Sequence, residues 1–124
     1  MKKTYRVKTN KDFKMIFDNR KSKANKQFVV YVLKKEEQEH IRVGLSVSKK
    51  LGNAVIRNRI KRKIRRAIFE INDILYKNYD IIIIARNPVV EMSVEDMKSS
   101  LKHVFKLCQL IKTDEKVEEK KSEE

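Results

Sequence analysis

Residues 53–75 read NAVIRNRIKRKIRRAIFEINDIL, and their two-sided pattern dictates how the rest of the chain must pack. An α-helix, with about 3.6 residues per turn, gathers the aliphatic side chains of this segment within an arc of about 120°. The basic side chains take the rest of the surface, so the pattern predicts a long helix with one core face and one positively charged face. Phe69 is the exception, because this aromatic falls on the charged side. The aliphatic set is Ile56, Ile60, Ile64, Ala67, Ile68 and Ile71.

Three further segments have the composition of β-strands. Residues 27–34 and 41–47 are rich in β-branched and aromatic side chains, and a short polar turn separates them. Because this connection is short, we expect the two strands to pair antiparallel. Residues 79–85 contain four consecutive isoleucines without the alternation of a half-exposed strand. We therefore expect a central strand that is covered on both faces.

Two shorter helices complete the pattern. Thr9 and Asp12 have the spacing of a helix cap, and Phe13, Ile16 and Phe17 follow at helical spacing. A last helix begins near residue 93, and its apolar side holds Met97, Leu101, Val104, Phe105 and Cys108. The predicted order α-β-β-α-β-α describes one α/β layered domain over residues 1–112, with a small central sheet covered by helices. Residues 113–124 are expected to form a flexible charged tail.

The chain carries a formal net charge of +14 over 124 residues, and this charge is unevenly distributed. The last twelve residues hold six acids and three lysines, whereas residues 48–66 hold nine basic residues and no acid. So dense a field attracts polyanions, and nucleic acid is the obvious one, because Lys and Arg displace its bound counterions. The alternatives are a solvated surface that serves solubility and a helix that lies on a membrane surface. The lack of interrupting acids argues against the first, and the isoleucines suit a protein core as well as a membrane.

Composition excludes several other classes. The longest apolar run has six residues, Phe28 to Leu33, far below the roughly 20 that cross a bilayer. No secretion signal is visible, and a single cysteine precludes an internal disulfide, so we expect a cytoplasmic protein. Two glycines cannot build a phosphate-cradling loop, and no catalytic triad or metal-ligand spacing is present. We interpret His40, His103 and Cys108 as ordinary structural residues and expect no protein-borne active site.

The side chains that carry binding chemistry are basic and aromatic. Arginine guanidinium groups fit pairs of phosphate oxygens, and Asn58 can reach base edges or a ribose hydroxyl. Phe13 and Phe17 share one helix face near Tyr31 in the adjacent strand, and single-stranded bases stack on such rings. Spacing alone favours the alternative that both phenylalanines pack in the core, and Tyr31 is compatible with either interpretation.

Three segments around the long helix form an extended motif: VGLSVSKK at residues 43–50, GNAV at 52–55 and RNRIKR at 57–62. This motif closely resembles the signature of the bacterial ribonuclease P protein component. The resemblance covers about residues 4–110, including the helix with two phenylalanines, FVVY at 28–31 and residues 80–88. Arg66 adds a charge where relatives often have an uncharged or acidic residue. The charged tail lies outside the resemblance.

The resemblance implies a subunit of an endoribonuclease that removes the 5′ leader of precursor tRNA. In this family the RNA subunit is the catalyst and, with the substrate, holds Mg²⁺, while the monomeric protein binds the ribonuclease P RNA and the leader. A leader-binding role is implied for Phe13, Phe17 and Tyr31, which reverses the preference for core packing. A left-handed β-α-β crossover through the basic helix is also implied, against the general right-handed rule. The residues implied to contact the RNA subunit are Lys50, Arg57, Asn58, Arg59, Lys61, Arg62 and Arg65.

Two rival functions stay open at this point. A ribosomal-type protein or RNA chaperone would bind many RNAs without supporting cleavage. A protein-only nuclease would need a cluster of carboxylates that holds metal ions.

Overall fold

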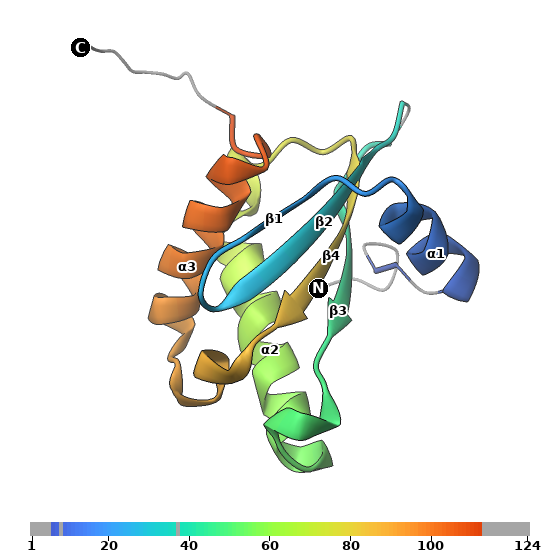
Figure 1. Cartoon of the computed structure of the whole chain (residues 1–124). Helices are drawn as coiled ribbons and strands as arrows, with labels where there is room; N and C mark the ends of the chain where they lie inside the picture. The colour runs from blue at the N-terminus through green and yellow to red at the C-terminus, as the bar shows by residue number, and fades with distance from the viewer. Residues whose placement is uncertain (1–5, 8, 37, 113–124) are drawn as a thin grey trace, which may run out of the picture.

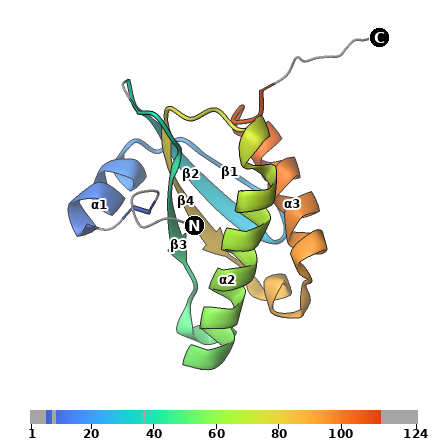
Figure 2. The same cartoon turned by 180° about the vertical axis from the view of Figure 1, so that it is seen from behind.

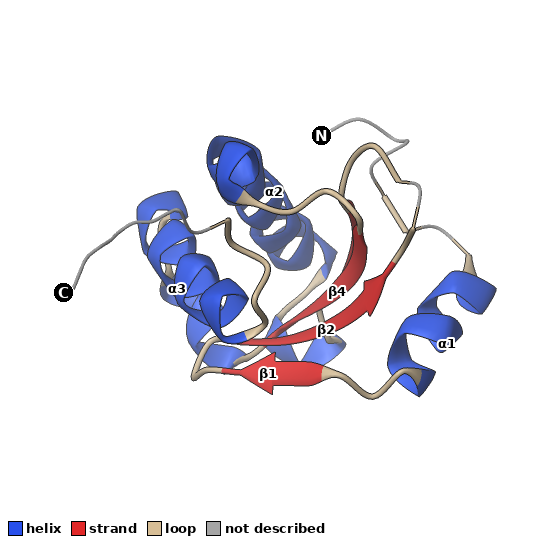
Figure 3. Cartoon of the chain, turned by 90° about the horizontal axis from the view of Figure 1, so that it is seen from above, coloured by secondary structure: helices blue, strands red, loops and turns tan. Residues whose placement is uncertain are grey.

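A four-stranded sheet divides the molecule into two unequal layers of helices (Figure 1). The computed structural model describes residues 6–7, 9–36 and 38–112. Helices α2 and α3 lie on one face of the sheet, and α1 lies on the other (Figure 3). The helices are α1 (Asn10–Asp18), α2 (Ala54–Ile71) and α3 (Val94–Leu107). The strands are β1 (Ser22–Ala24), β2 (Phe28–Lys34), β3 (Arg42–Ser46) and β4 (Tyr79–Ala85).

The predicted helix starts are confirmed, because each is fixed by a side-chain cap. The Thr9 hydroxyl accepts the Asp12 N–H at 3.0 Å in α1, and the Asn53 side chain accepts the Ile56 N–H at 3.0 Å in α2. In α3, the residues Ser93 and Asp96 form a reciprocal capping box. Each cap satisfies an N–H group that the first helical turn leaves without a partner.

The long basic helix ends four residues earlier than predicted. Helix α2 stops at Ile71, and a single 3₁₀ turn, Asn72–Ile74, follows it. Asn and Asp side chains compete for backbone hydrogen bonds and disfavour a helix interior, and residues 72–73 are Asn and Asp. The turn allows Leu75 to enter the core, where it is fully buried and bridges to Ile111.

The predicted antiparallel pairing of residues 27–34 with residues 41–47 is wrong. Strand β4 lies between them, in the order β1-β2-β4-β3. It pairs antiparallel with β2, Val30 opposite Ile83, and parallel with β3, Val43 opposite Ile81. The six residues 35–40 can reach about 20 Å, whereas two strand spacings measure about 10 Å, so the short connection does not force a hairpin. The central position predicted for residues 79–85 is confirmed, since Ile81, Ile82 and Ile83 are fully buried.

The path from β3 through α2 to the parallel strand β4 is a left-handed crossover (Figures 1 and 2). This confirms the handedness implied by the family resemblance, where the general rule favours the right-handed path. The crossover places α2 against the sheet on the same side as α3, with its outer surface uncovered (Figure 2).

Strand β1 was not predicted from the sequence, so the observed order is α-β-β-β-α-β-α. It has three residues, all exposed, and pairs antiparallel with β2 at the edge of the sheet. Its composition, Ser-Lys-Ala, has no β-branched or aromatic side chain that would signal a strand. Backbone pairing with β2 and contacts with α3 therefore hold it in place.

Two hydrophobic cores form, one on each face of the sheet. The larger lies under α2 and α3 and includes Phe28 and Phe105, which are fully buried. The smaller lies under α1 and consists of Val7, Ile16 and Ile82, with partly buried aromatic rings packed around it. No helix within the described ranges is long and apolar enough to cross a membrane. The tail predicted for residues 113–124 lies outside the described residues.

Replacing Ile16 with alanine tests how α1 is held. Ile16 is the one buried residue of α1, with an exposed fraction of 0%. We expect Ile16→Ala to lower the free energy of unfolding by about 2–5 kcal/mol, because it opens a cavity in the small core. Met15→Ala is the matched control, because Met15 is adjacent to Ile16 on the same helix but is 46% exposed. Urea denaturation of both variants checks this, and equal stability would contradict the assigned core.

Candidate nucleic-acid interface

Helix α2 carries a row of basic side chains, most of which have no acidic partner among the described residues. Within the part of the chain that the structure describes, no acidic side chain forms an ion pair with Arg57, Arg59, Lys61, Arg62 or Arg65. Arg59 and Arg62 are exposed, as is Asn58, which directly precedes Arg59 in the helix. A rigid helix therefore presents these charges to solvent at fixed spacing, available for an anionic partner.

Two of the helix cations have neutral partners that fix their direction. The Arg57 Nε donates to the Gly52 carbonyl at 3.2 Å, and the Lys63 Nζ donates to the Met92 carbonyl at 3.0 Å. Gly52 has a φ of 150°, and a Cβ there would lie 2.8 Å from Ile56 Cγ2, so the turn before α2 requires glycine. That turn exposes Lys50 beside the start of α2.

The three predicted aromatic residues come together on the opposite face of the sheet. The ring centroids of Phe17 and Tyr31 are 4.8 Å apart in an edge-to-face contact, and those of Phe13 and Phe17 are 6.5 Å apart. All three residues are half-buried, so they pack against the small core and also reach solvent. A Cβ at Gly44 would lie 2.7 Å from Phe13 Cζ, which shows that this ring rests directly on the backbone of β3.

An ion network ties this aromatic cluster to the sheet. Arg42 donates to the Asp12 carboxylate at 3.0 Å and lies 3.5 Å from the carboxylate of Asp80. Among the described residues, Asp80 is the only buried polar or charged side chain, and Lys35 lies 4.0 Å from it. The hydrogen bond from Arg42 holds the pKa of Asp12 below its usual range, with a smaller effect from Thr9. The lone acid in an apolar strand was the sequence signal for this network.

The two predicted sets of residues do not form one pocket. The basic residues line α2, whereas the aromatic residues lie under α1, and the sheet separates the two helices (Figure 3). A protein built in this way offers two distinct surfaces, one for phosphate groups and one for flat rings.

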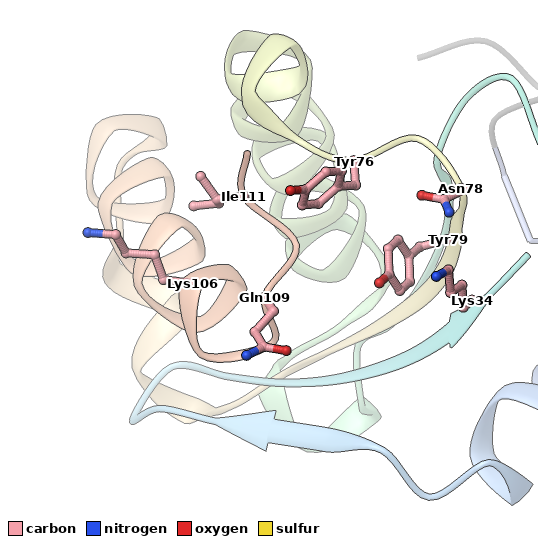
Figure 4. A pocket seen from close by; sticks show the side chains of 7 residues that line it. All are labelled: Lys34, Tyr76, Asn78, Tyr79, Lys106, Gln109 and Ile111. Carbon is pink, nitrogen blue, oxygen red and sulfur yellow. The ribbon is translucent and has the colours of Figure 1, made fainter. Parts of the chain in front are cut away.

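A further cleft lies where no residue was predicted, between the end of α3 and the segment that leads into β4 (Figure 4). Its volume is about 510 Å³, Tyr76 and Tyr79 project into it, and Lys34 and Lys106 also contribute to its lining. Its wall is completed by Asn78, Gln109 and Ile111. Tyr76 precedes β4 and Tyr79 is its first residue, and nothing in this spacing would have predicted a cleft from the sequence.

The described residues include few side chains that could bind a metal ion or act as a nucleophile. The described residues contain no group of three His, Cys, Asp or Glu side chains that could hold a metal ion. The ring Nδ1 of His103 lies 3.4 Å from the amide of Asn25. Cys108 is half-buried, and burial raises the pKa of its thiol to about 11, with a small opposing effect of Lys23.

The thiol of Cys108 is expected to be unreactive in the folded protein. Burial favours the neutral thiol, so at pH 8 the thiolate fraction is about two orders of magnitude below that of an unhindered cysteine. We expect slow reaction with a disulfide reagent at pH 8, and a rate that rises as the pH approaches about 11. Labelling of native and urea-unfolded protein checks this. Equal rates in both states would contradict the burial of the thiol.

Comparison with known proteins agrees with this arrangement. The family model described as Ribonuclease P matches residues 1–109. The ribonuclease P protein component of Bacillus cereus is 58% identical over 106 residues, covering 86% of this chain and 92% of the relative. The RNase P protein of Staphylococcus aureus superposes with a TM-score of 0.78 at 46% identity, covering 86% of this chain and 97% of that chain. The protein from Thermotoga maritima superposes with a TM-score of 0.75 at 28% identity, covering 82% and 96%. The chain therefore belongs to the family of bacterial ribonuclease P protein components.

Proposed function

We propose that this chain serves ribonuclease P by contacting two RNAs with its two separate surfaces. Family membership makes it a subunit of an endoribonuclease that processes the 5′ end of tRNA and whose RNA carries catalysis. The observation that carries the proposal is the division of the molecule. Helix α2 carries cations that form no ion pair with an acid among the described residues, and half-buried aromatic rings lie at α1 on the other face of the sheet.

The basic face of α2 is the proposed contact for the ribonuclease P RNA. Guanidinium groups bind phosphate oxygens in pairs, and the release of counterions from the RNA drives the association. Lys50 extends the charged surface beyond the start of the helix. The exposed amide of Asn58 adds a group that can bond to a base edge or a ribose hydroxyl. The proposed contact set is Lys50, Arg57, Asn58, Arg59, Lys61, Arg62 and Arg65.

The aromatic cluster is the proposed contact for the single-stranded leader of precursor tRNA. Phe13, Phe17 and Tyr31 are packed well enough to hold fixed positions and exposed enough to meet a base. Stacking accepts any base, so this surface would bind leaders of different sequence. Because Phe13 is already held against Gly44, its ring loses less conformational entropy on binding than a mobile ring would.

Magnesium is the cofactor that the family's reaction implies, and the described residues do not form a site for it. They lack a cluster of carboxylate, imidazole or thiol ligands, so we assign Mg²⁺ to the RNA subunit and the substrate. The protein supplies fixed positive charge and ring surfaces instead. The family match does not favour the alternatives of a ribosomal-type protein or RNA chaperone.

Replacing Arg59 with alanine tests the proposed contact with the RNA subunit. We expect the affinity for ribonuclease P RNA to fall by about 1–3 kcal/mol, because a charge-assisted phosphate contact is lost. The slope of log affinity against log salt should decrease in magnitude by about one. Lys102→Ala is the control, since this exposed lysine lies on α3. Filter binding at several KCl concentrations gives both quantities, and identical behaviour of the two variants would contradict the assignment.

Replacing Phe17 tests the proposed leader surface. We expect Phe17→Ala to weaken binding of precursor tRNA to the holoenzyme by about 1–3 kcal/mol and to leave mature tRNA unaffected. Phe17→Leu keeps most of the apolar packing but removes the flat ring, so it separates stacking from folding. Met15→Ala on the same helix is the control. If precursor and mature tRNA lost affinity equally, the leader assignment would be wrong.

A further inference from the structure

A hollow of about 360 Å³ lies beside the C-terminal half of α2. Four arginines and one aromatic residue line it: Arg6, Arg62, Arg65, Arg66 and Phe69. The last four are spaced at intervals of three and four residues, so they form one stripe along the helix. The volume is at the small end of the range for ligand sites, which run from about 300 to 1,000 Å³.

Arg6 reaches this hollow from a distant part of the sequence. The segment of Arg6 and Val7 lies along β3, with the Val7 N–H donating to the Val43 carbonyl at 3.0 Å. Val7 packs into the small core under α1, and alternation along an extended chain turns Arg6 toward α2 on the other side. The Nε of Arg6 is buried and has no hydrogen-bond partner among the residues that the structure describes. A buried charged donor of this kind is costly unless an acceptor binds it.

The guanidinium group of Arg65 is close enough to the positively charged Arg6 to be affected by it. Partial burial and the positive charge of Arg6 lower the pKa of the Arg65 guanidinium. Neither Arg6 nor Arg65 forms an ion pair with an acid among the described residues. Two guanidinium groups that repel each other across a hollow are stabilised by an anion between them, and a phosphate fits their donor geometry.

Phe69 gives the hollow a flat apolar wall. Its side chain is 64% exposed, and the guanidinium carbon of Arg66 lies 5.9 Å from its ring centroid. Arg66 is held in place, because its Nε donates to Glu70 at 2.6 Å and Glu70 also pairs with Lys98 at 2.9 Å. An exposed ring beside a fixed guanidinium is a platform on which an unpaired base stacks.

We propose that this hollow binds one unpaired nucleotide of an RNA, with its phosphate on Arg6 and Arg65 and its base on Phe69. The inference rests on the proposed function, because Arg62 and Arg65 belong to the face assigned to RNA. It adds that the RNA at this end of α2 is single-stranded locally, since a base in a duplex cannot offer its face to Phe69. A bare phosphate would leave Phe69 without a partner, and an apolar peptide would leave the Arg6 guanidinium without one.

The test compares substitutions of Phe69 in the full-length protein, in two binding measurements. One measures affinity for ribonuclease P RNA, and the other measures affinity of the assembled holoenzyme for precursor tRNA. We expect Phe69→Ala and Phe69→Leu to weaken one of these two affinities by about 5- to 150-fold, as for the loss of a stacked base. Phe69→Tyr keeps the ring, so we expect its affinity to match that of the unchanged protein. The first measurement responds if the RNA subunit supplies the nucleotide, and the second if the substrate does. Leu107→Ala is the control, because this apolar residue of α3 is 43% exposed.

A fluorescent variant gives an independent measurement. The chain has no tryptophan, so Phe69→Trp introduces a single reporter at the hollow. We expect its emission to be quenched when the RNA that responded above is added, and an Arg6→Ala substitution in the same chain to weaken that quenching. Leu107→Trp should show no comparable change.

The Arg59→Ala variant separates this inference from the proposed function. Loss of RNA affinity in Arg59→Ala with no effect of Phe69→Ala in either measurement would overturn the nucleotide site and leave the RNA-binding face of α2 intact. The site is supported if Phe69→Ala and Phe69→Leu both lose RNA affinity while Phe69→Tyr binds like the unchanged protein. This holds even if Arg59→Ala binds normally. No loss in any of these variants would overturn both proposals.

Discussion

The structure depends on the packing of the aliphatic stripe of α2 against the isoleucines of β4. Ile60, Ile64 and Ile68 share one core with Ile81 and Ile83, and all are buried. Burial of each such side chain stabilises the fold by about 1.5–3 kcal/mol, which offsets the repulsion among the cations on the outer face. Without this buried stripe, a helix with seven basic residues and a single acid would not stay helical in isolation. The fold thus holds a dense positive charge on a rigid surface.

The central position of β4 also creates the second surface. Because Ile82 points away from α2, it is buried only if another element covers the opposite face, and α1 does so through Ile16. The aromatic rings of Phe13, Phe17 and Tyr31 surround this small core and remain partly open to solvent. One strand therefore supports both the charged helix and the ring cluster, and it keeps them on opposite sides of the sheet.

Local sequence patterns predicted most of the helices and strands, but they did not predict how the strands pair. The two-sided pattern of α2, the isoleucine run of β4 and the caps at Thr9 and Ser93 are local features. Their elements formed where expected, except that α2 ends four residues early. Strand pairing is different, because residues 35–40 can either turn back or cross over β4, and composition does not distinguish the two paths. The family resemblance supplied the crossover handedness, which no local pattern contains. The hollow at Phe69 needed the structure, because Arg6 reaches it from the far end of the chain.

Reconstitution tests the central claim most directly, namely that this chain assists an RNA catalyst without carrying an active site of its own. The purified protein is mixed with a bacterial ribonuclease P RNA and a precursor tRNA at low magnesium concentration, and release of the 5′ leader is measured. The account predicts release that requires both the RNA subunit and the protein. Cleavage by the protein alone, or tight binding to the RNA subunit without any stimulation of cleavage, would contradict it.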